Sequence, residues 1–371
     1  MRQTANVAAE FARITDEEFG RAVVRRAVTP ERITKSLAGL AEKRIGIGPL
    51  SSGPIGLARI AAEGRLGPAR VSERPGDELA FTVTVPASLD FAVKLGAEST
   101  LRADIEIDLL FTPRPADPLL IAIDVAPVRG DDVRINLRGT GIAYSLVALL
   151  QGVSDELGRA VAHQVSGRVA GDGLRKSRTF DIAARIDGRR GGEVPESWTL
   201  IDHATFGRRF VERAVNADRV AAGFARLAGQ EIAIGPLRTG PRDLATVRAQ
   251  GAVGTPAVWA RPRGYEVMVP LQLELTVDLT VASRYDVAAR IPLVVTPTPA
   301  AALRIVIDIA PVEPDNVQAD VRPRSTIAGL LGRVGNIREQ VQRQVAKDVN
   351  RRLADPAGRV IDIGARIDGA R

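Results

Sequence analysis

The sequence contains the same series of motifs twice, in the same order. The distance between the copies falls only from 187 to 184 to 181 residues along the chain, so a few loops differ in length. A period this long indicates the duplication of a domain rather than a solenoid. We therefore predict one domain at 1–190 and a second at 191–371. The matching segments are 45–50 with 232–237, 124–128 with 308–312, and 178–188 with 359–369.

The composition is that of a folded protein with an aliphatic interior. Each copy has about 185 residues, which is enough to bury its own hydrophobic core. Hydrophobic residues make up 45% of the chain and charged residues 26%, values that exclude a disordered chain. Only 4% of residues are aromatic. The core must therefore be built almost wholly from aliphatic side chains.

Several function classes are excluded or weakened by what the sequence lacks. There is no cysteine, which rules out disulfides, thiolate metal sites and a cysteine nucleophile. Residues 1–19 have no apolar central region of the secretory type, and no uninterrupted apolar run approaches membrane-spanning length. These features predict a soluble, cytoplasmic protein, with peripheral membrane contact left open.

The net charge is +7, and arginine outnumbers lysine 46 to 5. A basic chain can attract nucleic acid or an anionic membrane. Heavy use of arginine with alanine, glycine and valine also reflects a GC-rich genome, and we favour this second explanation. The sequence has no basic stretch with interleaved aromatic residues on which bases would stack, so nucleic-acid binding is disfavoured.

Long alternating segments predict the sheet of each copy. Apolar residues occupy every second position from 271 to 281, which predicts a strand of about 36 Å, well above the usual length. The first copy alternates over 81–95, and further strands are expected at 105–111, 119–125 and 133–138. Turn residues separate these segments. The pattern indicates an antiparallel meander with one apolar and one polar face.

Helical periodicity surrounds this sheet in the sequence. Each copy begins with two predicted helices, separated at 29–31 in the first copy and at 216–218 in the second. Gly-Pro segments follow and indicate an edge strand or the entry to one. After the meander, one-sided apolar stripes predict long helices over 142–169 and 327–353.

Each copy ends in the same segment, at 181–188 and 362–369, which we interpret as a short strand. Paired carboxylates can perform acid–base chemistry. An ion pair that ties the last strand to its domain is the simpler interpretation. The polar residues that recur in both copies are Asp124 and Asp308, Asp181 and Asp362, Arg185 and Arg366, and Asp187 and Asp368.

The order of helix, edge strand, long meander, long helix and short strand resembles the tubular lipid-binding superfamily, which includes the bactericidal/permeability-increasing proteins. The resemblance covers nearly the whole chain and rests on element order, strand length and duplication. It implies an α+β fold: two tandem repeats, each a long antiparallel sheet rolled around a long helix. It also implies an apolar groove for acyl chains. The cysteines and secretory signal of the animal members are absent.

No known catalytic motif accompanies this pattern. The only histidines are His163 and His203, and neither recurs in the other copy. A Gly-Thr-Gly turn at 139–141 could cradle a phosphate, but it lacks a βαβ context and its counterpart has proline. We therefore predict a non-enzymatic protein with no cofactor and no dedicated metal site.

The sequence thus predicts the binding or transfer of a lipid or other hydrophobic ligand in apolar grooves. An alternative is a structural or assembly protein with fully packed cores and a protein partner. A filled core and a lined cavity have the same periodicity, so the sequence does not separate the two. The residues predicted to line the grooves are Phe91, Leu146, Leu149, Val153 and Leu157 in the first copy and Leu275, Leu331, Val334, Ile337 and Val341 in the second.

One probable hairpin tip differs between the copies. The second copy has Trp259, Arg261, Arg263 and Tyr265 at 259–265, where the first copy has no aromatic residue. Aromatic rings beside arginines suit the headgroup region of an anionic membrane. We therefore predict peripheral membrane docking through these four residues, with an ordinary loop as the alternative.

Overall fold

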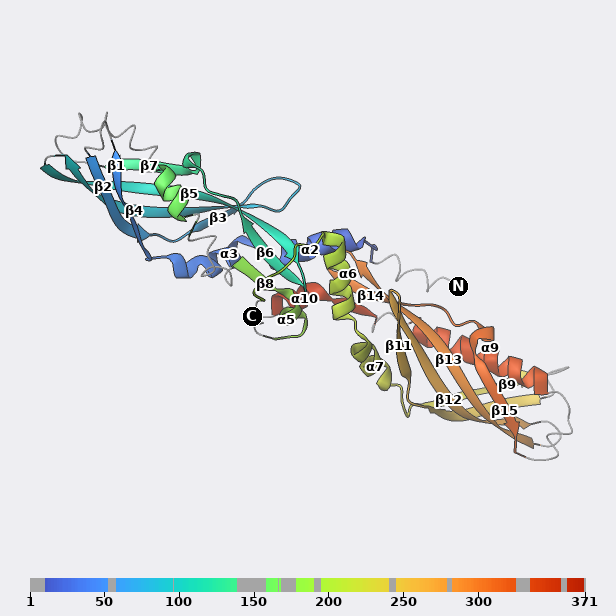
Figure 1. The fold of residues 1–371 in the computed structure, drawn as a ribbon. Coiled ribbons are helices and arrows are strands. Elements are labelled where there is room, and N and C mark those ends of the chain that lie inside the picture. The colour runs from blue at the N-terminus through green and yellow to red at the C-terminus, as the bar shows by residue number, and fades with distance from the viewer. Residues whose placement is uncertain are drawn as a thin grey trace. The chain divides into compact units, whose positions relative to one another are not determined.

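The chain forms two eight-stranded antiparallel sheets, each packed with helices, in the residues that the computed structural model describes (Figure 1). The predicted fold class, α+β with two tandem curled sheets, is confirmed. The described residues are 11–52, 58–95, 97–138, 158–165, 167, 178–189, 195–239, 245–278, 282–324, 334–354 and 359–369.

The elements of the two repeats follow one another in the same order. Those of the first are α2 Asp16–Ala27, α3 Pro30–Leu37, β1 Arg44–Ser52, β2 Ala58–Leu66, β3 Arg70–Glu73, β4 Phe81–Leu95, β5 Ala97–Ala116, β6 Leu120–Val125, β7 Val133–Arg138, β8 Thr179–Asp181 and α5 Ile182–Ile186. Those of the second are α6 His203–Ala214, α7 Ala217–Ala225, β9 Glu231–Thr239, β10 Ala245–Val253, β11 Ala257–Arg261, β12 Gly264–Asp278, β13 Ala282–Ala300, β14 Arg304–Ile309, β15 Gln318–Pro323, α9 Val334–Leu353, β16 Val360–Asp362 and α10 Ile363–Gly369.

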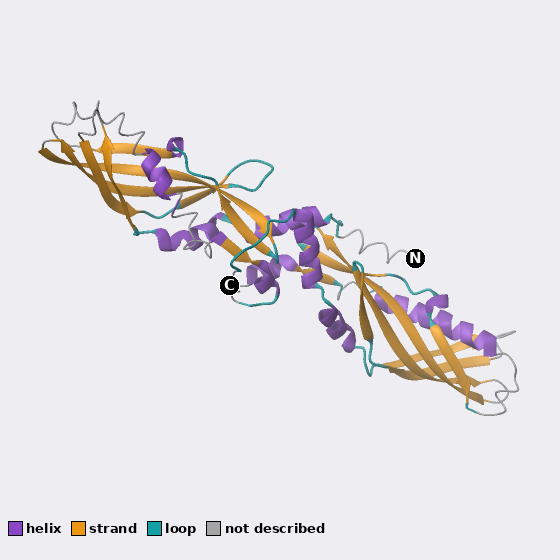
Figure 2. Cartoon of the chain, in the orientation of Figure 1, coloured by secondary structure: helices purple, strands orange, loops and turns teal. Residues whose placement is uncertain are grey.

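Two very long strands form the centre of each sheet, as the long orange arrows of Figure 2 show. In the second repeat β12 pairs with β13 from Tyr265 opposite Val295 to Asp278 opposite Ala282. Along β12 the side chains alternate between buried and more exposed positions, as the alternating sequence predicts. In the first repeat β4 pairs with β5 in the equivalent register, beginning with Phe81 opposite Phe111.

In each sheet one of the two central strands pairs along its outer side with two shorter strands, each of which covers a different part of its length. Along β5, residues 102–107 pair with β7 and residues 111–116 pair with β6. β13 divides in the same way between β15 and β14. At the opposite side each sheet ends in β1 or β9, the strands that contain the Gly-Pro motifs. The prediction of edge strands there is confirmed, because proline cannot donate to a ladder hydrogen bond.

The long helix predicted after each meander is present where the chain is described. In the second repeat α9 lies along the curled sheet (Figure 1), and Asn350 exchanges two hydrogen bonds with the backbone of Val312, at 2.8 and 2.9 Å. In the first repeat residues 158–165 are helical, and the Gln164 side chain donates to the carbonyl oxygen of Gly46. Side-chain hydrogen bonds to backbone groups thus tie both helices down.

The prediction that the closing segments 181–188 and 362–369 are strands is wrong, because only their first residues, Asp181 and Asp362, belong to strands. β8 and β16 are short, and helices α5 and α10 follow them at once. The carboxylates of Asp181 and Asp362 accept from the amides of Ala184 and Ala365, at 2.8 and 2.9 Å, and so cap these helices. Short apolar runs fit either period, and in these segments the aspartate cap decides for the helix.

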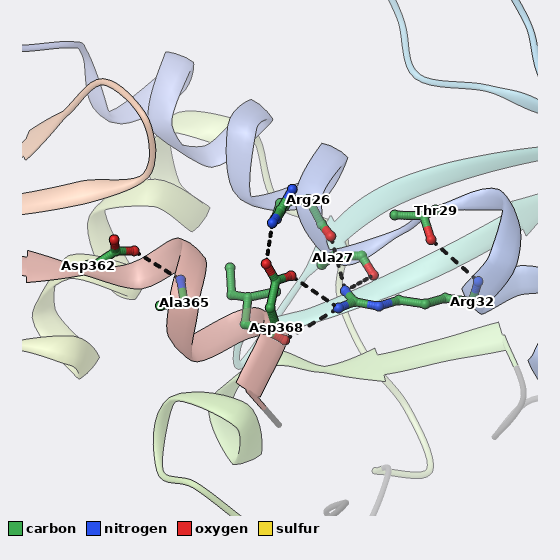
Figure 3. A network of polar contacts seen from close by, with 8 residues as sticks. Arg26, Ala27, Thr29, Arg32, Asp362, Ala365 and Asp368 are labelled. Atoms are coloured by element: carbon green, nitrogen blue, oxygen red, sulfur yellow. Dashed lines mark hydrogen bonds and ion pairs between the residues drawn. The ribbon is translucent and has the colours of Figure 1, made fainter. Parts of the chain in front are cut away.

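A repeated arginine closes the turn between the first two helices of each repeat. In the first repeat Arg32 donates to the carbonyl oxygens of Arg26 and Ala27, each at 3.0 Å, which satisfies acceptors that the end of α2 leaves free. Arg219 donates in the same way to the last carbonyls of its preceding helix. The carboxylate of Asp368 lies between Arg26 and Arg32 and pairs with both (Figure 3).

The ends of the repeats are exchanged between the two compact units of the chain. The described residues up to Thr15 belong with 208–365, and the described residues from Arg366 onward belong with 16–207. Arg13 bridges to Ala300 at the end of β13, and its equivalent, Leu200, bridges to Ala116 at the end of β5. The sequence does not predict this exchange, and the domain boundary placed at residue 190 stays a prediction.

Two equivalent buried glycines permit a close backbone approach. A Cβ atom on Gly20 would overlap the carbonyl oxygen of His203, and one on Gly207 would overlap the carbonyl oxygen of Asp16. Both contacts are to backbone atoms, which cannot move aside as the end of a flexible side chain could. Only glycine therefore fits at these two positions.

Replacing either glycine should destabilise the protein. We expect Gly20→Ala or Gly207→Ala to lower the free energy of unfolding by about 1–3 kcal/mol or more, because the added methyl group overlaps a backbone oxygen. Gly223→Ala in α7 is the matched control, since its Cβ would meet open space, and it should raise stability by up to about 1 kcal/mol. Urea denaturation measures all three, and equal effects at Gly20 and Gly223 would contradict the close approach.

A candidate ligand-binding groove

A cavity of about 290 Å³ lies between α9 and the sheet of the second repeat. Its floor is aliphatic, and β9, β10 and β12 each contribute side chains to it. The helix contributes Val341 and Val345, which are both buried. The lining residues are Ile234, Arg238, Val247, Ala249, Leu273, Leu275, Gln340, Val341, Arg343, Gln344, Val345 and Lys347.

A second cavity of about 190 Å³ adjoins the first, because Ile234 and Val345 line both. It continues along α9 toward α7, and its walls are again mainly aliphatic. We call the two cavities together the groove. The second cavity is lined by Phe224, Leu227, Gln230, Ile232, Ile234, Val253, Val269, Leu271, Ile291, Leu293, Val345, Asp348, Val349, Arg352 and Leu353.

The two periodicities of the sequence account for this lining. On β12 every second residue faces the groove, so Val269, Leu271, Leu273 and Leu275 lie in one row. On α9 residues four apart lie on one face. The chain therefore presents two facing aliphatic rows, with few rings to fill the space between them.

Charged residues differ between the two ends of the groove. Arg238, Arg343 and Lys347 line the first cavity and are exposed. Arg343 pairs with Glu339 at 3.1 Å. In the second cavity the nearly buried carboxylate of Asp348 pairs with Arg351 and Arg352, so its charge is compensated.

Two of the predicted lining residues, Leu275 and Val341, meet in the first cavity. Val334 and Ile337 lie in the first turn of α9, and Phe91 lies in β4, but the side chains of these three are outside the described residues. Leu146, Leu149, Val153, Leu157 and Leu331 also lie outside the described residues.

Two residues that are central to the groove, Ile234 and Val345, are not among those predicted from the sequence. Ile234 belongs to the repeated Gly-Pro motif, so the duplication marks it in the sequence. That motif by itself predicts only an edge strand. Val345 lies in the apolar stripe of the predicted helix, so its helix face was available from the sequence. Which members of that stripe border a cavity depends on packing, and periodicity does not contain this information.

The predicted membrane-docking residues lie on the β11–β12 hairpin. Trp259 is 51% exposed, and Arg263 occupies the turn with φ 61°. Arg261 pairs with Glu266 at 3.3 Å. The hydroxyl of Tyr265 donates to the carbonyl oxygen of Val215 at 2.6 Å, which anchors the hairpin to the end of α6.

The duplicated aspartates have structural partners. Asp308 pairs with Arg13 at 2.6 Å, and Asp124 lies 3.6 Å from Arg114. Asp187 pairs with Arg189 at 3.3 Å, and Asp368 pairs with the arginines of α2 and α3. The predicted ion pair between the closing segment and its domain is present at Asp368, whereas Asp187 pairs with the nearby Arg189, and Asp181 and Asp362 cap helices. Arg185 lies over the ring of Phe180.

His203 is the half-buried first residue of α6. Burial lowers the pKa of His203, and the positive charge of Arg21 lowers it further, while Glu17, Asp202 and Glu78 act in the opposite direction. The imidazole is therefore kept neutral over a wider pH range than an exposed histidine. His163, in contrast, is exposed on its helix.

The chain is similar to a solved structure of lipopolysaccharide binding protein, at 11% identity and a TM-score of 0.26, covering 84% of this chain and 83% of that chain. It is also similar to P47 of Clostridium botulinum E1, at 8% identity and a TM-score of 0.23, covering 91% of this chain and 86% of that chain. No protein-family model and no curated protein sequence matches it.

Within the described part of the chain, no helix combines the length and the apolar character needed to cross a membrane.

The environment of His203 predicts a pH dependence of stability. Because its pKa is lower in the folded state, the unfolded chain binds more protons between the folded value and the unfolded value of about 6.5. Stability should therefore rise with pH up to about 6.5 and then lose this dependence. His203→Gln should reduce the difference between the free energies of unfolding that urea denaturation gives below and above that pH. An unchanged slope in His203→Gln would contradict this assignment.

Proposed function

We propose that the protein binds a lipid or other hydrophobic ligand in the groove between α9 and the sheet of the second repeat. The observation that carries this proposal is the pair of adjoining cavities with aliphatic walls. Ligand sites are typically concave, mostly apolar and already formed before the ligand arrives. Binding of this kind requires no catalytic residue.

The energetics favour a ligand with a long apolar chain. Each buried methylene contributes about 0.8 kcal/mol, so about a dozen would contribute roughly 10 kcal/mol. Association costs an estimated 4–15 kcal/mol in lost freedom. A short chain would not offset this cost, whereas a long one would, without any motif specific to its chemistry.

The alternative, a fully packed assembly module, is less well supported in the second repeat. Packed interiors contain few voids larger than a water molecule, whereas the groove is unfilled over both cavities. A corresponding groove in the first repeat is part of the proposal. So is membrane docking through Trp259 and its neighbours, where exposure of the indole gives support.

Native mass spectrometry of the protein purified from its own host, followed by solvent extraction and lipid analysis, tests the proposal. We expect bound lipid on the unmodified protein. Ile234→Trp should reduce the occupancy of the groove severalfold, because the indole would occupy space shared by both cavities. Ala233→Trp is the matched control, since this neighbouring residue is exposed on the other face of the same strand.

A bare chain mass, together with no stabilisation by added phospholipid or fatty acid, would reject lipid binding. Equal occupancy in the two tryptophan variants would show that the ligand lies elsewhere. Circular dichroism and thermal unfolding of both variants establish that each one folds.

A further inference from the structure

The first cavity has a cationic edge at which, among the described residues, two of the three cations have no carboxylate partner. Arg238, Arg343 and Lys347 line this cavity, and none of its lining residues is acidic. Arg343 has a partner in Glu339. Among the described residues, no carboxylate lies within ion-pairing distance of Arg238 or Lys347. These two cations therefore leave positive charge at one end of an apolar groove.

The other end of the groove carries less net positive charge, since one carboxylate there lies against two arginines. There Asp348 pairs with Arg351 and Arg352, and the remaining walls include Phe224, Leu227 and Leu353. The two ends of the groove thus differ. One end has a strongly cationic edge, and the other end is more apolar. A ligand that matches this arrangement is an amphiphile with one anionic head.

The dimensions favour a single chain. The residues of α9 that line the groove run from Gln340 to Leu353, which at about 1.5 Å per residue is roughly 20 Å. Lys347 lies about midway along this span, roughly 9 Å from Leu353, so the headgroup and the chain share the length of the groove. The cavities of about 290 and 190 Å³ are each below the lower limit of about 300 Å³ for sites of drug-sized ligands. A two-chain lipid would need more room side by side.

We propose that the groove of the second repeat binds a single-chain fatty acid, with its carboxylate at Arg238 and Lys347 and its chain in the aliphatic cavities along α9. This inference rests on the proposed function and specifies its ligand. The exposed position of both cations suits a headgroup that remains at the water boundary. Arginine can hold a carboxylate with two parallel hydrogen bonds, and lysine adds a point charge.

The duplication supplies an internal comparison. At the repeat offsets of 187 and 184, Arg238 corresponds to Ser51 and Lys347 corresponds to His163. These two cations are therefore specific to the second repeat. The proposal accordingly assigns carboxylate recognition to that repeat alone.

Titration calorimetry with palmitate and with hexadecanol, at mildly alkaline pH, tests the proposal. The two ligands share a chain and differ in headgroup charge. We expect the unmodified protein to prefer palmitate by about tenfold, since two exposed ion pairs contribute modestly. The double variant R238Q/K347Q should lose this preference and keep its affinity for hexadecanol. Added salt should weaken the preference in the unmodified protein.

The double variant R248Q/R290Q is the control, because it removes the same charge from exposed positions on β10 and β13 that do not line the groove. It should retain the preference for palmitate. Equal loss in both double variants would indicate an effect of net charge and would overturn the proposal. So would equal affinities for palmitate and hexadecanol in the unmodified protein, which would leave lipid binding itself intact. Binding of neither ligand, with no lipid in the purified protein, would reject both proposals.

Discussion

The antiparallel pairing of two exceptionally long strands is the constraint on which each repeat depends. β12 and β13 stay in register over fourteen residue pairs, and one face of the pair is apolar along most of its length, with Ser283 as a buried polar residue. Neighbouring strands twist by roughly 20–25° relative to one another, and a sheet of such strands curls. Its concave face then has to be covered by an element of similar length, and α9 is that element. The facing surfaces of α9 and the sheet carry aliphatic side chains and few aromatic rings, and the groove is the space that these side chains do not fill.

The fold was predictable from the sequence where a long pattern has only one physical interpretation. Strict alternation over 271–281 can only be a strand with one buried face, and Thr29 before Pro30 marks the start of a helix. The closing segments were predicted wrongly, because Ile182 and Ile186 fit either a strand or one face of a helix. The cap by Asp181 decides that choice, and its effect depends on one local hydrogen bond.

The candidate groove could be predicted only in part. Leu275 and Val341 were identifiable because periodicity gives the inward face of an element. The cationic edge was not, because Arg238 and Lys347 are separated by more than a hundred residues and no local pattern joins them. Whether an inward face is filled or open depends on how closely helix and sheet pack. The composition suggests an answer through its few aromatic residues, but only the folded structure locates the space.

The exchange of terminal segments has a consequence for how such a chain could arise. Arg13 of the first copy bridges to the sheet of the second, and Leu200 of the second copy bridges to the sheet of the first. A single repeat made alone would therefore lack the segment that bridges to the end of its central strand. It could complete itself only by trading ends with a second molecule, as a swapped homodimer. Fusing two copies into one polypeptide replaces that encounter with an intramolecular one at high effective concentration. Completion of each sheet then no longer depends on how much protein the cell contains, and the two copies are free to diverge.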